Sequence, residues 1–193
     1  PKSRPSKSRS EPKGSDSSSP PEALCREYNW VSYEVLKTHS LMSDADITRL
    51  KVPDMPGCVL RCPAADEPIC VARPEGCPKF FFFYRDCLTR VQVSFPFTPF
   101  QMEALRYLRL APSQLHPNGW AYFVAFDRLC SHFSPPIACT ANLFFYFFGP
   151  FTPSPPKGSD KLRGLVSFRI NAERKLMTPF SDSFKCFKNA FFK

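Results

Sequence analysis

Glycine, histidine and long apolar runs are all scarce in this sequence. Its 193 residues include seven glycines and three histidines, and the longest apolar runs span only Phe80–Tyr84 and Leu143–Phe148. A helix that crosses a membrane needs about 20 apolar residues, and a signal peptide needs an apolar stretch near the N-terminus. The sequence has neither, so we expect no membrane partner.

Catalytic signatures are missing as well. The sequence has no GxxxxGKS/T phosphate-binding loop, no D-D-E or YxDD arrangement, and no D-S/T-G of an aspartic protease. Asp44 and Asp46 follow Ser43, which is typical of a helix with a serine cap and an acidic first turn. We therefore predict a protein that is not an enzyme, with no catalytic residue, no cofactor and no small-molecule substrate.

Nine cysteines without a secretory signal indicate a reducing compartment. We expect an intracellular protein, in the cytoplasm or the nucleus. Four thiolates can hold one zinc ion, and four cysteines lie close together in sequence: Cys58, Cys62, Cys70 and Cys77. Because no C-x2-C pair and no nearby histidine accompanies them, no metal site is predicted. The others lie among apolar residues, as small core side chains do: Cys25, Cys87, Cys130, Cys139 and Cys186.

The formal net charge of +9 comes from the two ends of the chain. Residues 1–21 carry +3 and residues 157–193 carry +6, whereas residues 22–156 hold twelve charges of each sign. Basic segments suit a polyanion such as nucleic acid, and they also keep a phenylalanine-rich protein soluble. The candidate nucleic-acid contacts are Lys2, Arg4, Lys7, Arg9, Lys185 and Lys188.

Two aromatic runs, Phe80–Tyr84 and Phe184–Phe192, stand beside basic residues. Exposed rings over a cationic groove bind single-stranded nucleic acid by base stacking. Since no RNP-like motif accompanies these runs, we favour the interpretation that they pack in the core.

The composition divides the chain in two. Residues 1–22 are rich in serine and proline and lack large apolar residues, so we predict a disordered, basic tail. Residues 23–193 have the composition of a folded domain, which we expect to be truncated at the C-terminus. Outside its central part the expected elements are helices over Glu22–Lys37 and from Ser43 to about Leu50, strands at Cys58–Cys62, Phe80–Tyr84 and Cys87–Phe95, and a hairpin of Leu165–Ile170 with Lys175–Phe180.

The central part, about 98–149, predicts a core of three or more helices. Thr98, Pro99 and Gln101 form a capping-box pattern, and the helix they begin should end at Leu110. Asn118 is the expected cap of a second helix that is apolar nearly all round, as in a core or an interface. With short β-hairpins on either side of these helices, the predicted fold class is α+β.

A third helix, Ala141–Phe148, should begin at the cap Thr140 and be closed by Gly149 and Pro150. We expect Trp120 to be buried between the first and third of these helices, with its indole over the turn 111–117. His116 lies in that turn, where a ring nitrogen can satisfy a free backbone group. Cys130 and His132 stand two apart on a helix and point in different directions, so they form no catalytic pair.

This helical stretch resembles the plant gypsy-type retrotransposon (plant transposon protein) domain, whose members typically show PF…L…L…APSQLHPNAW…F…LC. Residues 111–120 here are APSQLHPNGW, with Gly119 in place of the usual alanine. The resemblance assigns no catalytic residue. The motif and core positions that carry it are Pro99, Phe100, Leu105, Leu108, Gln114, Leu115, Pro117, Asn118, Trp120, Phe126 and Leu129.

In such elements the domain looks like the N-terminal part of a gag-like polyprotein. The resemblance therefore implies a non-catalytic domain that works by protein–protein association, either with itself or with other element-encoded proteins. Two alternatives stay open. One is a nucleic-acid-binding module that contacts RNA through its basic ends, and the other is a degenerate element fragment with no selected activity.

Overall fold

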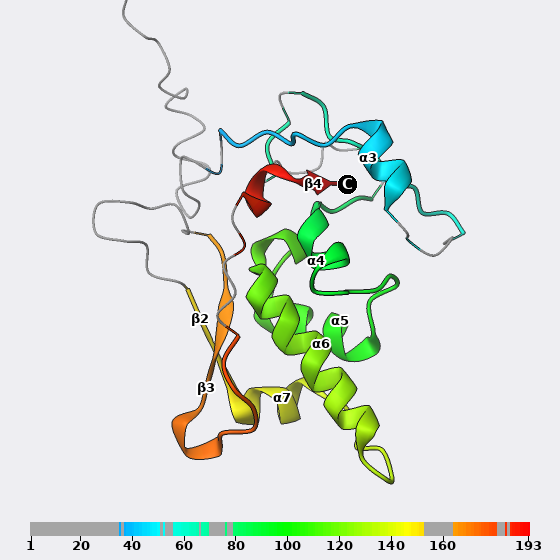
Figure 1. Cartoon of the computed structure of the whole chain (residues 1–193). Helices are drawn as coiled ribbons and strands as arrows, with labels where there is room; N and C mark the ends of the chain where they lie inside the picture. Colours follow the sequence, from blue (N-terminus) through cyan, green and yellow to red (C-terminus); the bar gives the residue numbers. More distant parts are fainter. Residues whose placement is uncertain are drawn as a thin grey trace, which may run out of the picture.

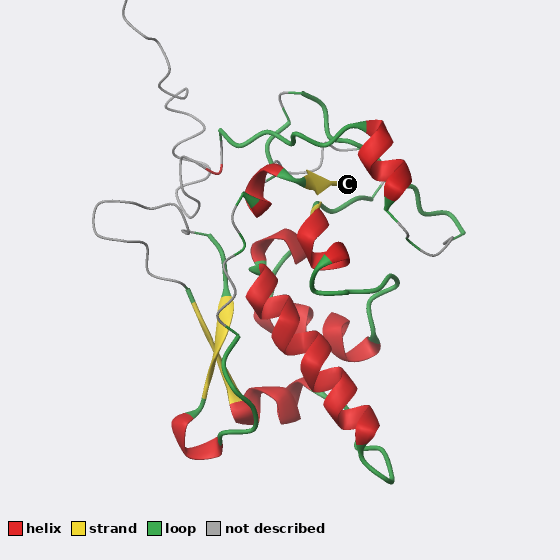
Figure 2. Ribbon diagram, in the orientation of Figure 1, coloured by secondary structure: helices red, strands yellow, loops and turns green. Residues whose placement is uncertain are grey.

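The computed structural model describes residues 35, 37–50, 52, 56–65, 67–69, 76, 79–152, 164–180, 184 and 186–193. Within these residues the fold is α+β, as predicted, with five α-helices whose two ends are both described and two small antiparallel sheets (Figure 1, Figure 2). The predicted tail 1–22 and nearly all of the predicted helix Glu22–Lys37 lie outside the described residues. The elements are α3 (Asp44–Arg49), β1 (Phe83–Tyr84), α4 (Arg85–Thr89), α5 (Pro99–Leu108), the 3-10 turn η1 (Pro112–Gln114), α6 (Pro117–His132), α7 (Ala141–Phe147), β2 (Phe148–Phe151), β3 (Ser167–Ile170), the 3-10 turns η2 (Ala172–Arg174) and η3 (Phe187–Asn189), and β4 (Phe191–Phe192).

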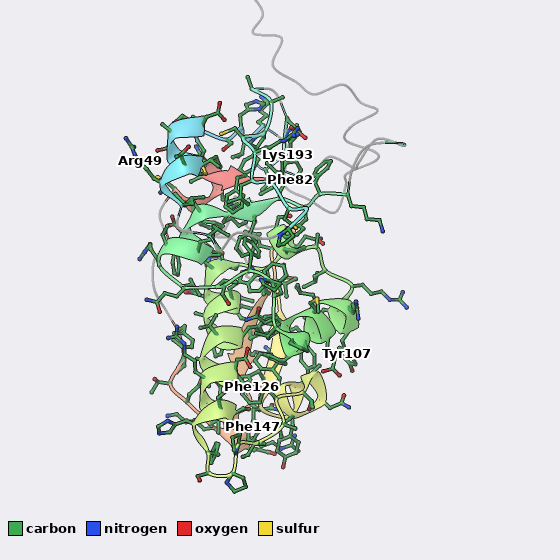
Figure 3. The ribbon with its side chains drawn as sticks, turned by 90° about the vertical axis from the view of Figure 1, so that its right-hand side faces the viewer. Arg49, Phe82, Tyr107, Phe126, Phe147 and Lys193 are labelled. Carbon is green, nitrogen blue, oxygen red and sulfur yellow. The ribbon has the colours of Figure 1, made fainter. Side chains whose placement is uncertain are left out.

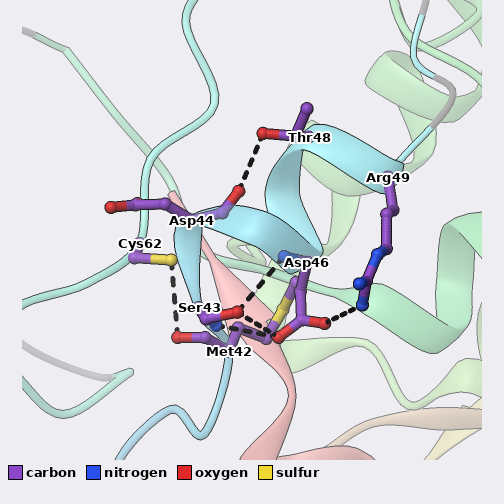
Figure 4. Close-up of polar contacts among 7 residues, drawn as sticks. All are labelled: Met42, Ser43, Asp44, Asp46, Thr48, Arg49 and Cys62. Atoms are coloured by element: carbon purple, nitrogen blue, oxygen red, sulfur yellow. Dashed lines mark hydrogen bonds and ion pairs between the residues drawn. The ribbon is translucent and has the colours of Figure 1, made fainter.

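Helices α3 and α5 begin at the predicted side-chain caps. The hydroxyl of Thr98 accepts a hydrogen bond from the Gln101 N–H at 3.3 Å, and the Gln101 Oε1 accepts one from the Thr98 N–H at 3.2 Å. Ser43 and Asp46 make the same reciprocal pair at the start of α3 (Figure 4). Helix α5 ends at Leu108 rather than at Leu110, because Arg109 adopts a left-handed backbone with φ of 53°.

The start of α6 corrects the prediction that Asn118 is its cap. The cap is His116, whose Nδ1 accepts a hydrogen bond from the Asn118 N–H at 3.0 Å. Pro117 occupies the first helical position, where a missing N–H costs nothing. Asn118 therefore lies inside the first turn of the helix, while the ring nitrogen of His116 satisfies a backbone group as expected.

Helix α7 begins at the predicted cap, since the Thr140 hydroxyl accepts a hydrogen bond from the Leu143 N–H at 3.2 Å. Its predicted closure by Gly149 and Pro150 is wrong, because the chain continues directly from the helix into strand β2. The strand conformation buries the ring of Phe148 completely. Burial of this ring in the core therefore accompanies the change from helix to strand.

Strand β2 pairs with β3, and this pairing overturns the predicted hairpin of Leu165–Ile170 with Lys175–Phe180. Phe148 lies opposite Ile170, and Phe151 lies opposite Ser167. Residues 175–180 form no strand. The strand that pairs with β3 thus comes before it in the chain. The alternation of apolar and polar residues within 165–180 cannot reveal this partner.

Two other predicted strands are also wrong. Residues 58–62 have no regular secondary structure. In the predicted strand Cys87–Phe95, the first residues belong to helix α4 and the rest form a bend. Residues 86 and 90 lie one helical turn apart. The buried carboxylate of Asp86, only 5% exposed, therefore forms an ion pair with the guanidinium of Arg90 at 3.6 Å. Of the predicted strand Phe80–Tyr84, only Phe83 and Tyr84 pair, and they do so with β4.

The C-terminal segment joins parts of the chain that are far apart in sequence. The carbonyl of Asn189 accepts a hydrogen bond from the Leu41 N–H at 2.7 Å, and Lys193 exchanges both backbone hydrogen bonds with Arg61, at 2.7 and 2.9 Å. Figure 1 shows β4 between the segment that leads into α3 and helix α4. The segment therefore links the chain before β1 to the rest of the fold.

The opposite end of the molecule has a core of aromatic rings around Phe144 of α7. Four rings from three other elements lie 4.7–5.5 Å from it: Phe100 of α5, Phe123 and Phe126 of α6, and Phe148 of β2. Phe168 of β3 completes the cluster at 4.9 Å. In Figure 3, Phe126 and Phe147 mark this end, and Phe82 and Lys193 mark the other.

Trp120 connects the two ends. It is fully buried, as predicted, and its Nε1 donates a hydrogen bond to the Pro112 carbonyl at 3.3 Å. Its ring neighbours are Phe83, Phe97 and Phe123, at 5.0–5.8 Å. The prediction also placed Trp120 against the third helix, α7. Instead, the ring of Phe123 contacts Phe144 of α7, and Trp120 contacts Phe83 of β1.

Candidate functional site

The QLHPNGW turn between α5 and α6 is a structural unit. The Val166 N–H donates to the Gln114 carbonyl, and the His116 N–H donates to the Val166 carbonyl, both at 2.8 Å. Leu115 between them is completely buried. The motif that carries the family resemblance thus attaches the chain before β3 to the start of α6.

His116 stays neutral in this turn. Burial, and to a lesser extent the ammonium of Lys188, lowers the pKa of His116 to about 4. Its ring lies 5.0 Å from the buried Phe187. A neutral imidazole is required if Nδ1 is to accept a hydrogen bond, so the environment of His116 suits its role as a helix cap.

The motif positions differ in how far their side chains are buried. Pro99 is exposed at the first position of α5. Partly buried positions are Leu108, Gln114, Asn118 and Leu129. Buried positions are Phe100, Leu105, Leu115, Pro117, Trp120 and Phe126.

The basic residues singled out as nucleic-acid contacts are not brought together in the described part of the chain. Lys188 is partly buried beside His116. The other five lie outside the described residues: Lys2, Arg4, Lys7, Arg9 and Lys185.

The two aromatic runs supply core side chains rather than a stacking surface. Phe82, Phe83 and Tyr84 are at most 4% exposed, and Phe191 and Phe192 at most 1%. This confirms the interpretation that they pack inside. Phe81, at 43%, is the exposed ring of the first run.

The cysteines show no metal centre in the described part of the chain, where no group of three or more candidate ligands gathers. Cys62 donates to the Met42 carbonyl at 3.4 Å (Figure 4), and Cys58 is exposed. Cys25, Cys70 and Cys77 lie outside the described residues. Cys87 and Cys130 are buried as expected, whereas Cys186 is exposed, contrary to its prediction as a core residue.

An open groove with a volume of about 600 Å³ lies between α6 and the start of α5. Of the five residues of α6 that line one side, four follow the spacing of a single helix face: Val124, Asp127, Arg128 and Ser131. Also lining it are Gln92, Ser94, Thr98, Gln101 and His132. The sequence reading missed this groove because the helix looked apolar nearly all round, although the polar spacing 127, 128, 131 was visible.

The bend before α5 positions one side of the groove. Gln92 has a left-handed backbone with φ of 64°, a conformation uncommon for residues other than glycine. Its Oε1 accepts a hydrogen bond from the Arg128 guanidinium at 2.9 Å. This bond fixes the charged end of Arg128 at the groove.

A second surface is formed by the exposed face of α5 and the neighbouring part of α7. Tyr107 is 66% exposed, and its ring stacks on the partly buried Phe145 with centroids 4.8 Å apart. Met102 is 40% exposed on the same helix, with Arg106 exposed between them. We call these four residues the α5–α7 surface, and Tyr107 is labelled in Figure 3.

Residues 82–150, from the strand β1 region to β2, match the family model described as "Putative gypsy type transposon". Over this stretch the chain is similar to transposon proteins. The match spans less than half of the chain and includes α5, the QLHPNGW turn, α6 and α7. No curated protein and no solved structure matches the chain.

The transposon-related stretch contains both the groove and the α5–α7 surface. All residues that line the groove and all four of the α5–α7 surface fall within it.

Among the described residues no helix has the length and hydropathy of a membrane span.

Proposed function

We propose that this chain is a non-catalytic, gag-like domain of a plant gypsy-type retrotransposon that works inside the cell by protein–protein association. The transposon match over residues 82–150 supports the element type. The observation that carries the association is the exposed α5–α7 surface. The partner is a second copy of the chain or another protein encoded by the element.

Helix α6 is not the surface that associates. Its large apolar side chains are used inside the fold, since Trp120, Tyr122, Phe123 and Phe126 are each at most 2% exposed. The apolar pattern of this helix therefore reports core packing. An interface must use side chains that remain outside.

The α5–α7 surface has the composition of an interface. Tyrosine, phenylalanine, methionine and arginine are enriched where proteins meet. All four types occur on this surface, where Tyr107, Met102 and Arg106 are exposed and Phe145 is partly buried. Glu103 and Arg106 are exposed on α5 and carry opposite charges, and the Glu103 carboxylate also accepts a hydrogen bond from the Ala141 N–H at 3.0 Å. Such a surface can be complementary to itself across a two-fold axis.

Sedimentation analysis of the purified chain over a range of concentrations tests this proposal. We expect a dimer or larger species that dissociates on dilution, and we expect Tyr107→Ser and Met102→Ser each to weaken it. Phe133→Ser is the control, because Phe133 is 47% exposed in the segment after α6, outside this surface. A strictly monomeric parent at high micromolar concentration, with a native circular dichroism spectrum, would contradict association. Equal weakening by the control would contradict the surface.

A further inference from the structure

We propose that Cys130 and Cys139 are a reversible disulfide site, which a small-molecule disulfide such as oxidised glutathione converts from two thiols into one S–S bond. This modification does not rest on the proposed association. Three features of the molecule point to it: the path of the loop after α6, the contact between the two thiols, and the difference in their exposure.

The loop after α6 folds back onto the helix that it leaves (Figure 1). The Ile137 N–H donates a hydrogen bond to the Cys130 carbonyl at 3.0 Å, and Cys139 follows two residues later. On the other side of Cys139, the Ala141 N–H donates to the Glu103 carboxylate at 3.0 Å. The backbone therefore holds Cys139 between two anchored positions, close to the last turn of α6.

The two thiols are in contact with each other. The Cys139 thiol is in hydrogen-bond contact with the Cys130 thiol and with the carboxylate of Asp127, which lies three positions before Cys130 on α6. Both cysteines are free thiols. Since an S–S bond is about 2.05 Å long, sulfur atoms already in contact need only a small movement to form it.

The exposure of the two side chains sets the order of the reaction. Cys130 is only 3% exposed, whereas Cys139 is partly buried and follows the exposed residues 131–138. The Cys139 thiolate attacks the small disulfide, which releases one glutathione and leaves a mixed disulfide on Cys139. Cys130 then attacks the Cys139 sulfur and releases the second glutathione. Two protein thiols are thus oxidised to one S–S bond, the small disulfide is reduced to two thiols, and these take up the two protons.

The surroundings of Cys139 act on the rate of the first step. Burial, and then the negative charge of Asp127, raises the pKa of the Cys139 thiol. Because the thiolate is the attacking species, the first step should be slow at neutral pH. The stability of the bond does not depend on this rate, so the site is best tested at equilibrium.

Equilibration of the full chain in buffers of reduced and oxidised glutathione tests the site. After the remaining thiols are alkylated, trypsin leaves both cysteines in one peptide, 129–157, because residues 129–156 contain no Lys or Arg. We expect this peptide to be unalkylated and lighter than the reduced peptide by two hydrogens. The equilibrium constant for the bond should be at least about tenfold larger in native buffer than in concentrated urea, since the fold holds the two thiols together. An equal or smaller constant in native buffer would overturn the proposal.

Two variants show whether the cysteines act as a pair. In Cys139→Ser, the buried Cys130 should remain a thiol at the glutathione ratio that closes the bond in the parent. Cys186→Ala is the matched control, because it removes one exposed thiol and leaves both members of the pair, so the bond should form as in the parent. Glutathione attached to Cys130 in a folded Cys139→Ser variant would contradict the paired reaction, and so would loss of the bond in Cys186→Ala.

Discussion

At the scale of the residue, His116 makes the stability of the fold depend on pH. Its Nδ1 accepts the Asn118 N–H at 3.0 Å, and its pKa of about 4 lies below the ordinary 6.5. Between these values the unfolded chain binds a proton that the folded chain does not. The free energy of unfolding should therefore fall as the pH drops through this window, by about 3 kcal/mol at most, and be fully retained above it.

Urea unfolding at several pH values across this window measures the effect. His116→Asn is the control, since asparagine also caps helices and does not titrate there. Its free energy of unfolding should lose this part of the pH dependence. Identical pH profiles for the two proteins would show that His116 is accessible to protons in the folded state.

Trp120 is the residue whose loss should be most damaging. Replacing a buried tryptophan by alanine costs about 3–5 kcal/mol, a large part of the roughly 5–15 kcal/mol that stabilises a domain. Trp120→Ala should therefore unfold or aggregate. Trp120→Phe keeps a ring beside Phe83 and Phe97 but loses the bond to the Pro112 carbonyl, so thermal unfolding should show a smaller loss. An alanine variant that melts with the parent would contradict this arrangement of the core.

At the scale of the element, the start of α6 is shaped around Gly119. A Cβ at this position would lie 2.7 Å from Leu115 Cδ1 and 2.9 Å from its Cγ. Alanine favours a helix over glycine by about 0.5–1 kcal/mol, but overpacking a core costs about 1–3 kcal/mol. Because Leu115 is completely buried, we expect Gly119→Ala to lower the free energy of unfolding.

A double-mutant cycle with Leu115→Ala isolates this effect. Leu115→Ala removes both atoms that the new Cβ would meet, so Gly119→Ala should become stabilising in that background. Urea unfolding of the four proteins gives the coupling energy. The same penalty in both backgrounds would place the strain elsewhere than at Leu115.

At the scale of the whole molecule, the C-terminal segment should couple the chain before β1 to the helical core. Removing residues 190–193 deletes β4 and both backbone bonds between Lys193 and Arg61. Hydrogen exchange at the Arg61 amide should then approach that of an unfolded chain. The Phe144 amide, which bonds to Thr140 at 3.0 Å, is the internal reference and should exchange more slowly. Unchanged protection of Arg61 would contradict this coupling.

Short-range features were predictable because both partners lie within one turn of chain. Thr98 with Gln101, Ser43 with Asp46, and Thr140 as the α7 cap could all be read from spacing and residue type. Thr98 and Gln101 of the α5 cap also line the groove, but the sequence did not show which residues lie opposite them. Arg128, which also lines the groove, comes 27 positions after Gln101 in the chain.

The sequence by itself therefore determined the α+β class, the capped starts of α3, α5 and α7, the burial of Trp120 and the resemblance to a transposon domain, whereas it misplaced the cap of α6. Only the tertiary structure decided that β3 pairs with β2, that β4 pairs with β1, and that Trp120 faces β1. A cap is a hydrogen bond within one turn, so neighbouring residues specify it. Strand partners and ring contacts depend on which apolar side chains can be buried together, and distant segments of the chain settle that jointly.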